Sequence, residues 1–192
     1  MPRPRYSLAA ILLALAACAS APRAGSPPPA APAAPHDAAV YAAVLDHLVQ
    51  VGKVAVVIDS TFIPRGGGAD IVQDASAEVV RNFAEANRTR RPVPRPLPSA
   101  RTIRFTRLAD LPFARNSGPR DLEALWRSFY EQFPGSGGYF DFSGIGFDAT
   151  YSTAVVYAGH HCGSLCGTGR RVTLRRTGSR WEVAKADMLW VS

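Results

Sequence analysis

Two cysteines and two histidines stand close together near the C-terminus, and they are the residues of this chain best suited to chemistry. His160, His161, Cys162 and Cys166 fall in a glycine-rich connection between two β-type runs. Imidazole nitrogens and thiolates are ligands for zinc or copper, and two thiols can also join in a disulfide. The stretch therefore predicts either a metal site or a structural clamp.

The spacing favours the clamp. Three residues separate Cys162 from Cys166, which matches no standard zinc pattern and differs from the C-x-x-C motif of redox-active pairs. Neighbouring residues on a strand point to opposite faces, so His160 and His161 would not both reach one ion unless the strand ends there. We expect a disulfide between Cys162 and Cys166 and no cofactor. A metal site made of these two cysteines and both histidines is the alternative.

A hydrolytic site would need a nucleophile, a base and a residue that orients the base. The candidates for these roles are Ser136, Ser143, Ser152, Ser164, His160, His161, Asp141 and Asp148. No G-x-S-x-G signature selects among them. We therefore expect a non-catalytic binding or structural module, with a metal-binding or hydrolytic enzyme centred on residues 160–166 as the alternative.

The first 18 residues have the pattern of a targeting segment. Arg3 and Arg5 precede an apolar run over residues 8–17, which is shorter than the roughly 20 residues that span a bilayer. The run ends in Leu15–Ala16–Ala17–Cys18, which resembles the lipobox of bacterial lipoproteins. The resemblance implies cleavage before Cys18 and acylation of that cysteine, so that the membrane is the first expected partner. Ala19 follows in place of the Asp that favours inner-membrane retention in such proteins, so the periplasmic face of the outer membrane is favoured.

Assigning Cys18 to the lipid leaves the other two cysteines as a pair in an exported compartment, where disulfides persist. Residues 19–35 are rich in proline and alanine, a composition typical of an extended tether. Residues 36–192 are expected to form a single domain.

The charge balance indicates a further class of partner. The formal net charge is +7, because the chain has 22 lysine and arginine residues and 15 acidic residues. A positively charged protein of this kind can bind an anionic surface, and another envelope protein is a further possible partner. Nucleic acid is not expected as a partner, because the arginines are scattered and no recognition motif accompanies them. The arginine-rich run 88–96 is broken by prolines and is interpreted as a solvated linker.

The periodicity of apolar residues predicts three helices followed by a region of strands. Helices are expected over residues 37–49, with Asp37 as N-cap, over 74–87 and over 119–133. Strands are expected at 53–59 and 102–106, and then at 139–147, 152–158, 171–176, 180–184 and 187–191. This order predicts an α+β fold, with the helices packed on one face of a mostly antiparallel sheet and a β-meander at the C-terminus.

The C-terminal third also resembles a family of uncharacterised exported bacterial proteins. The segments that carry this resemblance, within residues 125–192, are 129–138, 143–147, 154–157, 167–169 and 190–192. The resemblance implies a shared fold and supplies no activity.

Overall fold

The computed structural model describes residues 35–68, 70–114 and 121–192. The predicted leader, the Cys18 lipobox and nearly all of the tether lie outside these residues. Three α-helices are present in the described residues: α1 (Pro35–Leu48), α2 (Ala77–Ala86) and α3 (Leu122–Gln132). Single turns of 3-10 helix occur at η2 (Leu108–Asp110) and η3 (Pro112–Ala114), while η1 (Arg65–Gly68) is kinked at Gly66 and Gly67, whose φ angles are 61° and 71°. None of the described helices is long and apolar enough to cross a membrane.

Seven strands of the described residues form one sheet in the order β2-β1-β3-β5-β6-β7, with β4 pairing separately with β5. The strands are β1 (Val54–Ile58), β2 (Thr102–Thr106), β3 (Ser136–Phe142), β4 (Gly146–Phe147), β5 (Thr153–Gly163), β6 (Cys166–Thr177) and β7 (Arg180–Val191). β1 is parallel to β2 and β3, and all other pairs are antiparallel. The α+β fold and its C-terminal meander β5–β6–β7 are therefore as the sequence predicts.

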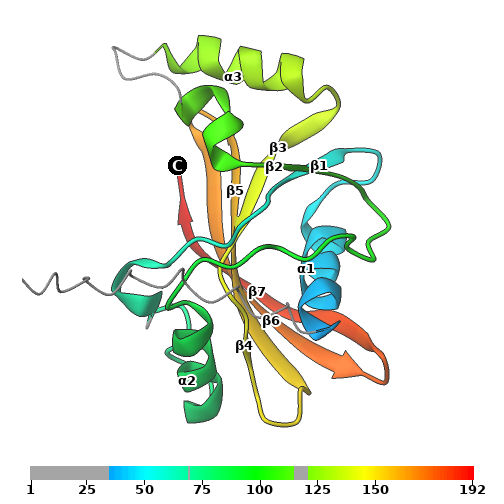
Figure 1. The fold of residues 1–192 in the computed structure, drawn as a ribbon, viewed down its shortest axis with the longest axis vertical. Coiled ribbons are helices and arrows are strands. Elements are labelled where there is room, and N and C mark those ends of the chain that lie inside the picture. Colours follow the sequence, from blue (N-terminus) through cyan, green and yellow to red (C-terminus); the bar gives the residue numbers. More distant parts are fainter. Residues whose placement is uncertain (1–34, 69, 115–120) are drawn as a thin grey trace, which may run out of the picture.

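The helices cover both faces of the sheet, which corrects the expectation that they share one face (Figure 1). α1 packs with Ala55 and Val57 in the largest apolar cluster. α3 packs on the opposite face, where Val56 and Ile58 point. α2 lies on that second face too, against Val155 of β5. Because residues 55–58 of β1 are all buried, this strand needs cover on both sides.

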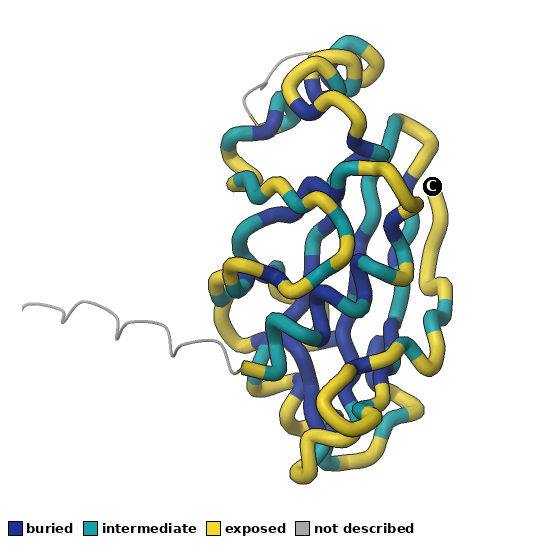
Figure 2. Tube along the Cα trace, turned by 90° about the vertical axis from the view of Figure 1, so that its right-hand side faces the viewer, coloured by how far each residue is buried: buried dark blue, intermediate teal, exposed yellow. Residues whose placement is uncertain are grey.

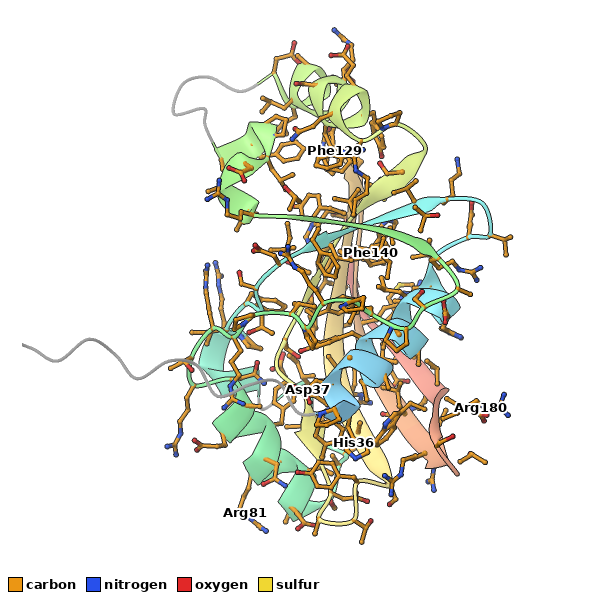
Figure 3. All side chains as sticks on the ribbon, turned by 45° about the vertical axis from the view of Figure 1, so that its right-hand side comes forward. His36, Asp37, Arg81, Phe129, Phe140 and Arg180 are labelled. Atoms are coloured by element: carbon orange, nitrogen blue, oxygen red, sulfur yellow. A yellow bond between two sulfur atoms is a disulfide. The ribbon has the colours of Figure 1, made fainter. Side chains whose placement is uncertain are left out.

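Buried positions follow the middle of the sheet, whereas the end of β7 is exposed (Figure 2). Phe129 of α3 and Phe140 of β3 belong to two separate apolar clusters on opposite faces of the sheet (Figure 3).

Several elements begin or end at other residues than the sequence predicts. α1 begins at Pro35, so Asp37 lies in its first turn, while Ser76 and Asp121 cap α2 and α3. The two predicted strands at 180–184 and 187–191 form the single strand β7.

Two glycines allow α2 to lie directly on the sheet. A Cβ atom on Gly146 of β4 would fall 2.6 Å from Phe83 Cβ and 2.8 Å from the Val79 carbonyl oxygen, both on α2. A Cβ on Gly144 would fall 2.6 Å from the Ala86 carbonyl oxygen. Asn82 of α2 donates a hydrogen bond of 2.7 Å to the Phe147 carbonyl. This contact forms one wall of the cleft described below.

We predict that Gly146→Ala lowers the free energy of unfolding by about 1–3 kcal/mol, because the methyl group forces α2 away from β4. Gly137→Ala is the matched control, since a Cβ there meets no atom within 4 Å. Urea denaturation of the two variants measures the difference. Equal stability of the two variants would contradict the close packing of α2 on β4.

Candidate functional site

The cysteine pair forms the predicted clamp at the β5–β6 hairpin. A disulfide joins Cys162 and Cys166, whose Cα atoms lie 5.0 Å apart. The hydroxyl of Tyr130 on α3 donates a hydrogen bond of 2.7 Å to the Cys162 carbonyl. The hairpin end is therefore closed covalently and tied to α3.

The two histidines point to opposite faces of β5. His160 stacks on Phe140 with ring centroids 4.5 Å apart, and its Nε2 donates to the Gly137 carbonyl at 2.9 Å. Burial lowers the pKa of the His160 imidazole, which keeps the ring neutral. His161 stacks on Tyr139 at 4.6 Å on the other face. Each ring thus has a packing partner on the neighbouring strand β3.

The structure does not bring the four alternative metal ligands together. Both sulfur atoms belong to the disulfide, and the histidines lie on different faces. His160 and the disulfide line a cavity of about 490 Å³, to which His161 does not contribute. Within the described part of the chain, no three His, Cys, Asp or Glu side chains are grouped as metal ligands.

Of the residues considered for hydrolysis, the structure places one histidine beside a carboxylate: His161 Nε2 and Asp141 Oδ2 lie 3.3 Å apart. Ser143 is buried and donates to the Gly144 carbonyl. Ser152 donates to Asp148. No serine among the described residues hydrogen-bonds to either histidine, so no nucleophile stands beside the His161–Asp141 pair.

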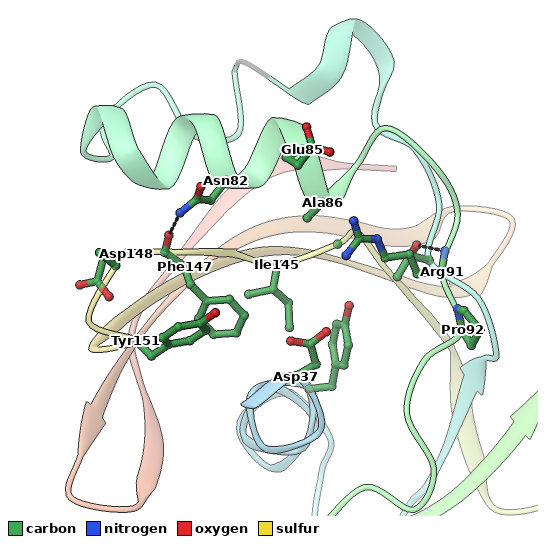
Figure 4. Close-up of a pocket in the computed structure, with 14 residues that line it drawn as sticks. Asp37, Asn82, Glu85, Ala86, Arg91, Pro92, Ile145, Phe147, Asp148 and Tyr151 are labelled. Carbon is green, nitrogen blue, oxygen red and sulfur yellow. Dashed lines mark hydrogen bonds between the residues drawn. The ribbon is translucent and has the colours of Figure 1, made fainter. Parts of the chain in front are cut away.

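A cleft that combines charged and aromatic groups lies at the start of α1. It has a volume of about 450 Å³ and lies between α1, α2, the segment 86–92 and the turn that follows β4. Figure 4 shows Asp37 entering from α1, Tyr151 from the turn and Arg91 from the opposite side, while Glu85 of α2 directs its carboxylate away from the cleft. We call this hollow the α1 cleft.

Asp37 is the acidic group of the α1 cleft. Its carboxyl forms no hydrogen bond or ion pair with any residue that the structure describes. Burial raises the pKa of Asp37 to about 6 from an ordinary 3.8, and the nearby Arg91 guanidinium opposes this rise. The hydroxyl of Tyr41, one helical turn further along α1, is already engaged in a hydrogen bond, which it donates to the Ser143 carbonyl at 2.8 Å. Asp37 is therefore free to pair with a bound group.

Arg91 is the basic group of the cleft, and only its backbone is held. Its N–H donates to Thr61 Oγ1 at 3.0 Å, and its carbonyl accepts from the Thr61 N–H at 2.8 Å. Ser60 and Pro92 form a β-bridge beside these bonds. Within residues 35–68, 70–114 and 121–192 the guanidinium has no hydrogen-bond or ion-pair partner.

Aromatic rings form the remaining wall. Tyr151 has a φ of 52°, a left-handed backbone conformation that costs a non-glycine residue about 1–2 kcal/mol. Asp148 holds this turn, because its carboxylate accepts hydrogen bonds from the N–H groups of Ser152 and Thr153 at 2.7 and 3.1 Å. The Tyr151 ring stacks on His36 at 5.0 Å and lies 5.1 Å from Phe147. The turn thus presents an aromatic surface to the cleft.

Sequence reasoning missed this site. It assigned Asp37 to a helix cap and Arg91 to a solvated linker, and Tyr151 carried no signal. The composition change at residue 36 and the arginine-rich run were visible, but nothing local indicated that they meet. Comparison with known proteins adds no information, since no family model, curated protein or solved structure matches the chain.

We predict that Asp37→Asn stabilises the fold near neutral pH. The folded-state pKa lies above 3.8, so ionised Asp37 opposes folding above about pH 6, and the penalty fades as the pH falls toward 4. A shift of two pKa units corresponds to about 3 kcal/mol. Partial exposure reduces the expected gain to about 1 kcal/mol. Denaturation at about pH 8 should show this gain and at about pH 4 little of it.

The control for this prediction is Glu131→Gln, which removes an exposed carboxyl from α3. It should leave stability unchanged at both pH values. A gain for Asp37→Asn of the same size at both pH values would show that ionisation of Asp37 is not its cause.

Proposed function

We propose that this protein is a lipid-anchored cell-envelope protein, attached through Cys18, whose folded domain is a non-catalytic binding module. The α1 cleft is the binding site in this proposal. The observation that carries it is that Asp37 and Arg91, which have no hydrogen-bond or ion-pair partner among the described residues, face one cavity beside an aromatic wall. Partly buried charges without partners oppose folding, and a ligand that pairs with both would offset this cost.

The anchor and the cleft are close in the chain. α1 begins at Pro35, the last residue of the predicted tether, and Asp37 follows within its first turn. A proline-rich tether of 17 residues at about 3.1 Å per residue would reach roughly 50 Å. The cleft would then work within tens of ångströms of the membrane, and the outer membrane is the favoured location.

The disulfide supports an exported domain. Cys162 and Cys166 are bonded in the folded chain, and such bonds persist in oxidising compartments and are rare in the cytosol. The hydrolytic alternative is supported only by the His161–Asp141 pair, which could serve as base and orienter. We favour the binding role because no nucleophile accompanies that pair in the described residues.

We predict that Cys18→Ser releases the protein from membranes. Stable anchoring needs two or more acyl chains, each buried CH₂ contributing about 0.8 kcal/mol, and serine in place of Cys18 offers no thioether for them. Fractionation of cells that express each form measures the change. The double variant Cys162→Ser/Cys166→Ser is the matched control and should stay in the membrane fraction. A Cys18→Ser protein that remains there with unchanged mass would rule out the anchor.

We also predict the number of reactive thiols in denatured protein isolated from the envelope. With Cys18 acylated and the other cysteines bonded, the protein should show no free thiol before reduction and two after it. A chain that keeps an unmodified Cys18 would show one free thiol before reduction and three after it. Titration with a thiol reagent, with and without prior reduction, separates these outcomes.

A further inference from the structure

We infer that the α1 cleft binds a small zwitterion, namely an α-amino acid with free ammonium and carboxylate groups and an apolar side chain. The inference rests on the proposed binding role of the cleft and adds the chemical class of the ligand. In this arrangement Asp37 receives the ammonium, Arg91 receives the carboxylate, and the aromatic wall covers the side chain.

The first argument is the relation between the two charges. Asp37 and Arg91 are close enough for the guanidinium to act on the carboxyl, yet they form no ion pair with each other. They reach the cleft from different elements, α1 and the segment that follows α2 (Figure 4). A ligand with one charge would satisfy one of them and leave the other without a partner. A zwitterion satisfies both, and the planar guanidinium suits a carboxylate in particular.

The second argument is that the other carboxylates of the cleft are engaged. Glu85 pairs with Arg88 at 3.0 Å on the exposed side of α2. Asp148 accepts the hydrogen bonds that hold the Tyr151 turn. A hard metal ion would need several convergent oxygen ligands, and the described residues contain no such group. An organic ammonium needs only one free carboxylate, which Asp37 supplies.

The third argument is the apolar surface beside the charges. Ile145 is buried at the base of the cleft, and Phe147 and Tyr151 stand along one side (Figure 4). A volume of about 450 Å³ is within the usual range for small-ligand sites. This surface favours an amino acid whose side chain is aliphatic or aromatic over a bare diamine or a polar amino acid.

The site also predicts a pH dependence. Asp37 must be ionised to receive an ammonium, so affinity should fall by about tenfold between pH 7.5 and pH 5 as its carboxyl takes up a proton. Other titratable or charged groups face or adjoin Asp37 in the cleft: His36, Tyr41, Glu85, Arg91, Asp148 and Tyr151. If the affinity of Asp37→Asn no longer changes with pH, the pH dependence belongs to Asp37 and not to one of these other groups.

The test uses the full chain purified in detergent and calorimetric titration with three probes. Phenylalanine carries both charges, N-acetylphenylalanine lacks the ammonium, and phenylalanine amide lacks the carboxylate. We expect each capped probe to bind at least tenfold more weakly than phenylalanine. Asp37→Asn should lower the affinity for phenylalanine by at least tenfold and leave the affinity for N-acetylphenylalanine unchanged. Arg91→Gln should lower the affinity for phenylalanine by the same factor and leave the affinity for phenylalanine amide unchanged.

Two substitutions on α3 serve as matched controls, because Glu131→Gln and Arg127→Gln remove exposed charges of the same kinds outside the cleft. Neither should change any affinity. The unchanged affinity for one capped probe shows that each cleft variant is folded.

Several results would overturn the inference. An amide that binds as tightly as phenylalanine would indicate a cation site, and equal binding of N-acetylphenylalanine would indicate an anion site. If Asp37→Asn or Arg91→Gln weakens the binding seen in either case, the ligand class is wrong but the α1 cleft is still a binding site. If neither variant weakens the binding of phenylalanine, both the ligand class and the binding role of the cleft are wrong. Absence of saturable binding by all three probes would overturn the ligand class, while fractionation of Cys18→Ser tests the anchor independently.

Discussion

The central constraint on this fold is that the middle of β5, residues 154–158, packs against an apolar cluster on each face. Ala154, Val156 and Ala158 point into the cluster under α1, whereas Val155 and Tyr157 point to the opposite side. The same strand pairs with β3, β4 and β6. Apolar side chains on both sides of one strand remain out of water only if each face is covered. The placement of the helices and the position of the C-terminal meander follow from this requirement.

The α1 cleft is a consequence of how those layers meet. Gly144 and Gly146 let α2 rest on the sheet, and α1 lies across the other face with Asp37 in its first turn. The backbone around Arg91 is fixed to Thr61, so the guanidinium and the carboxyl share one hollow without closing into an ion pair. The backbones that carry the two opposite charges are therefore held at a fixed separation by the elements around the cleft.

Much of the fold could be predicted, because its elements have strong local patterns. The apolar stripe of α3, the alternation in the meander and the cysteine spacing each correspond to an observed feature. The predicted arrangement of the helices was wrong in one respect, since the apolar run at 53–59 was compatible with burial on both faces but all helices were expected on one face of the sheet. A strand whose residues 55–58 are all apolar and buried needs cover on both faces, and parallel pairing of β1 with β2 and β3 places it inside the sheet.

The sequence by itself determined the helices and most of the strands, the expected pairing of Cys162 with Cys166 and the expectation of an acylated Cys18, because periodicity, spacing and leader patterns are local. Only the tertiary structure decided that His160 and His161 serve as packing partners on different faces. It also decided that Asp37, Arg91 and Tyr151, distant in the chain, line one cleft. No local pattern records which charges remain unpaired after folding, since that depends on contacts between elements far apart in sequence.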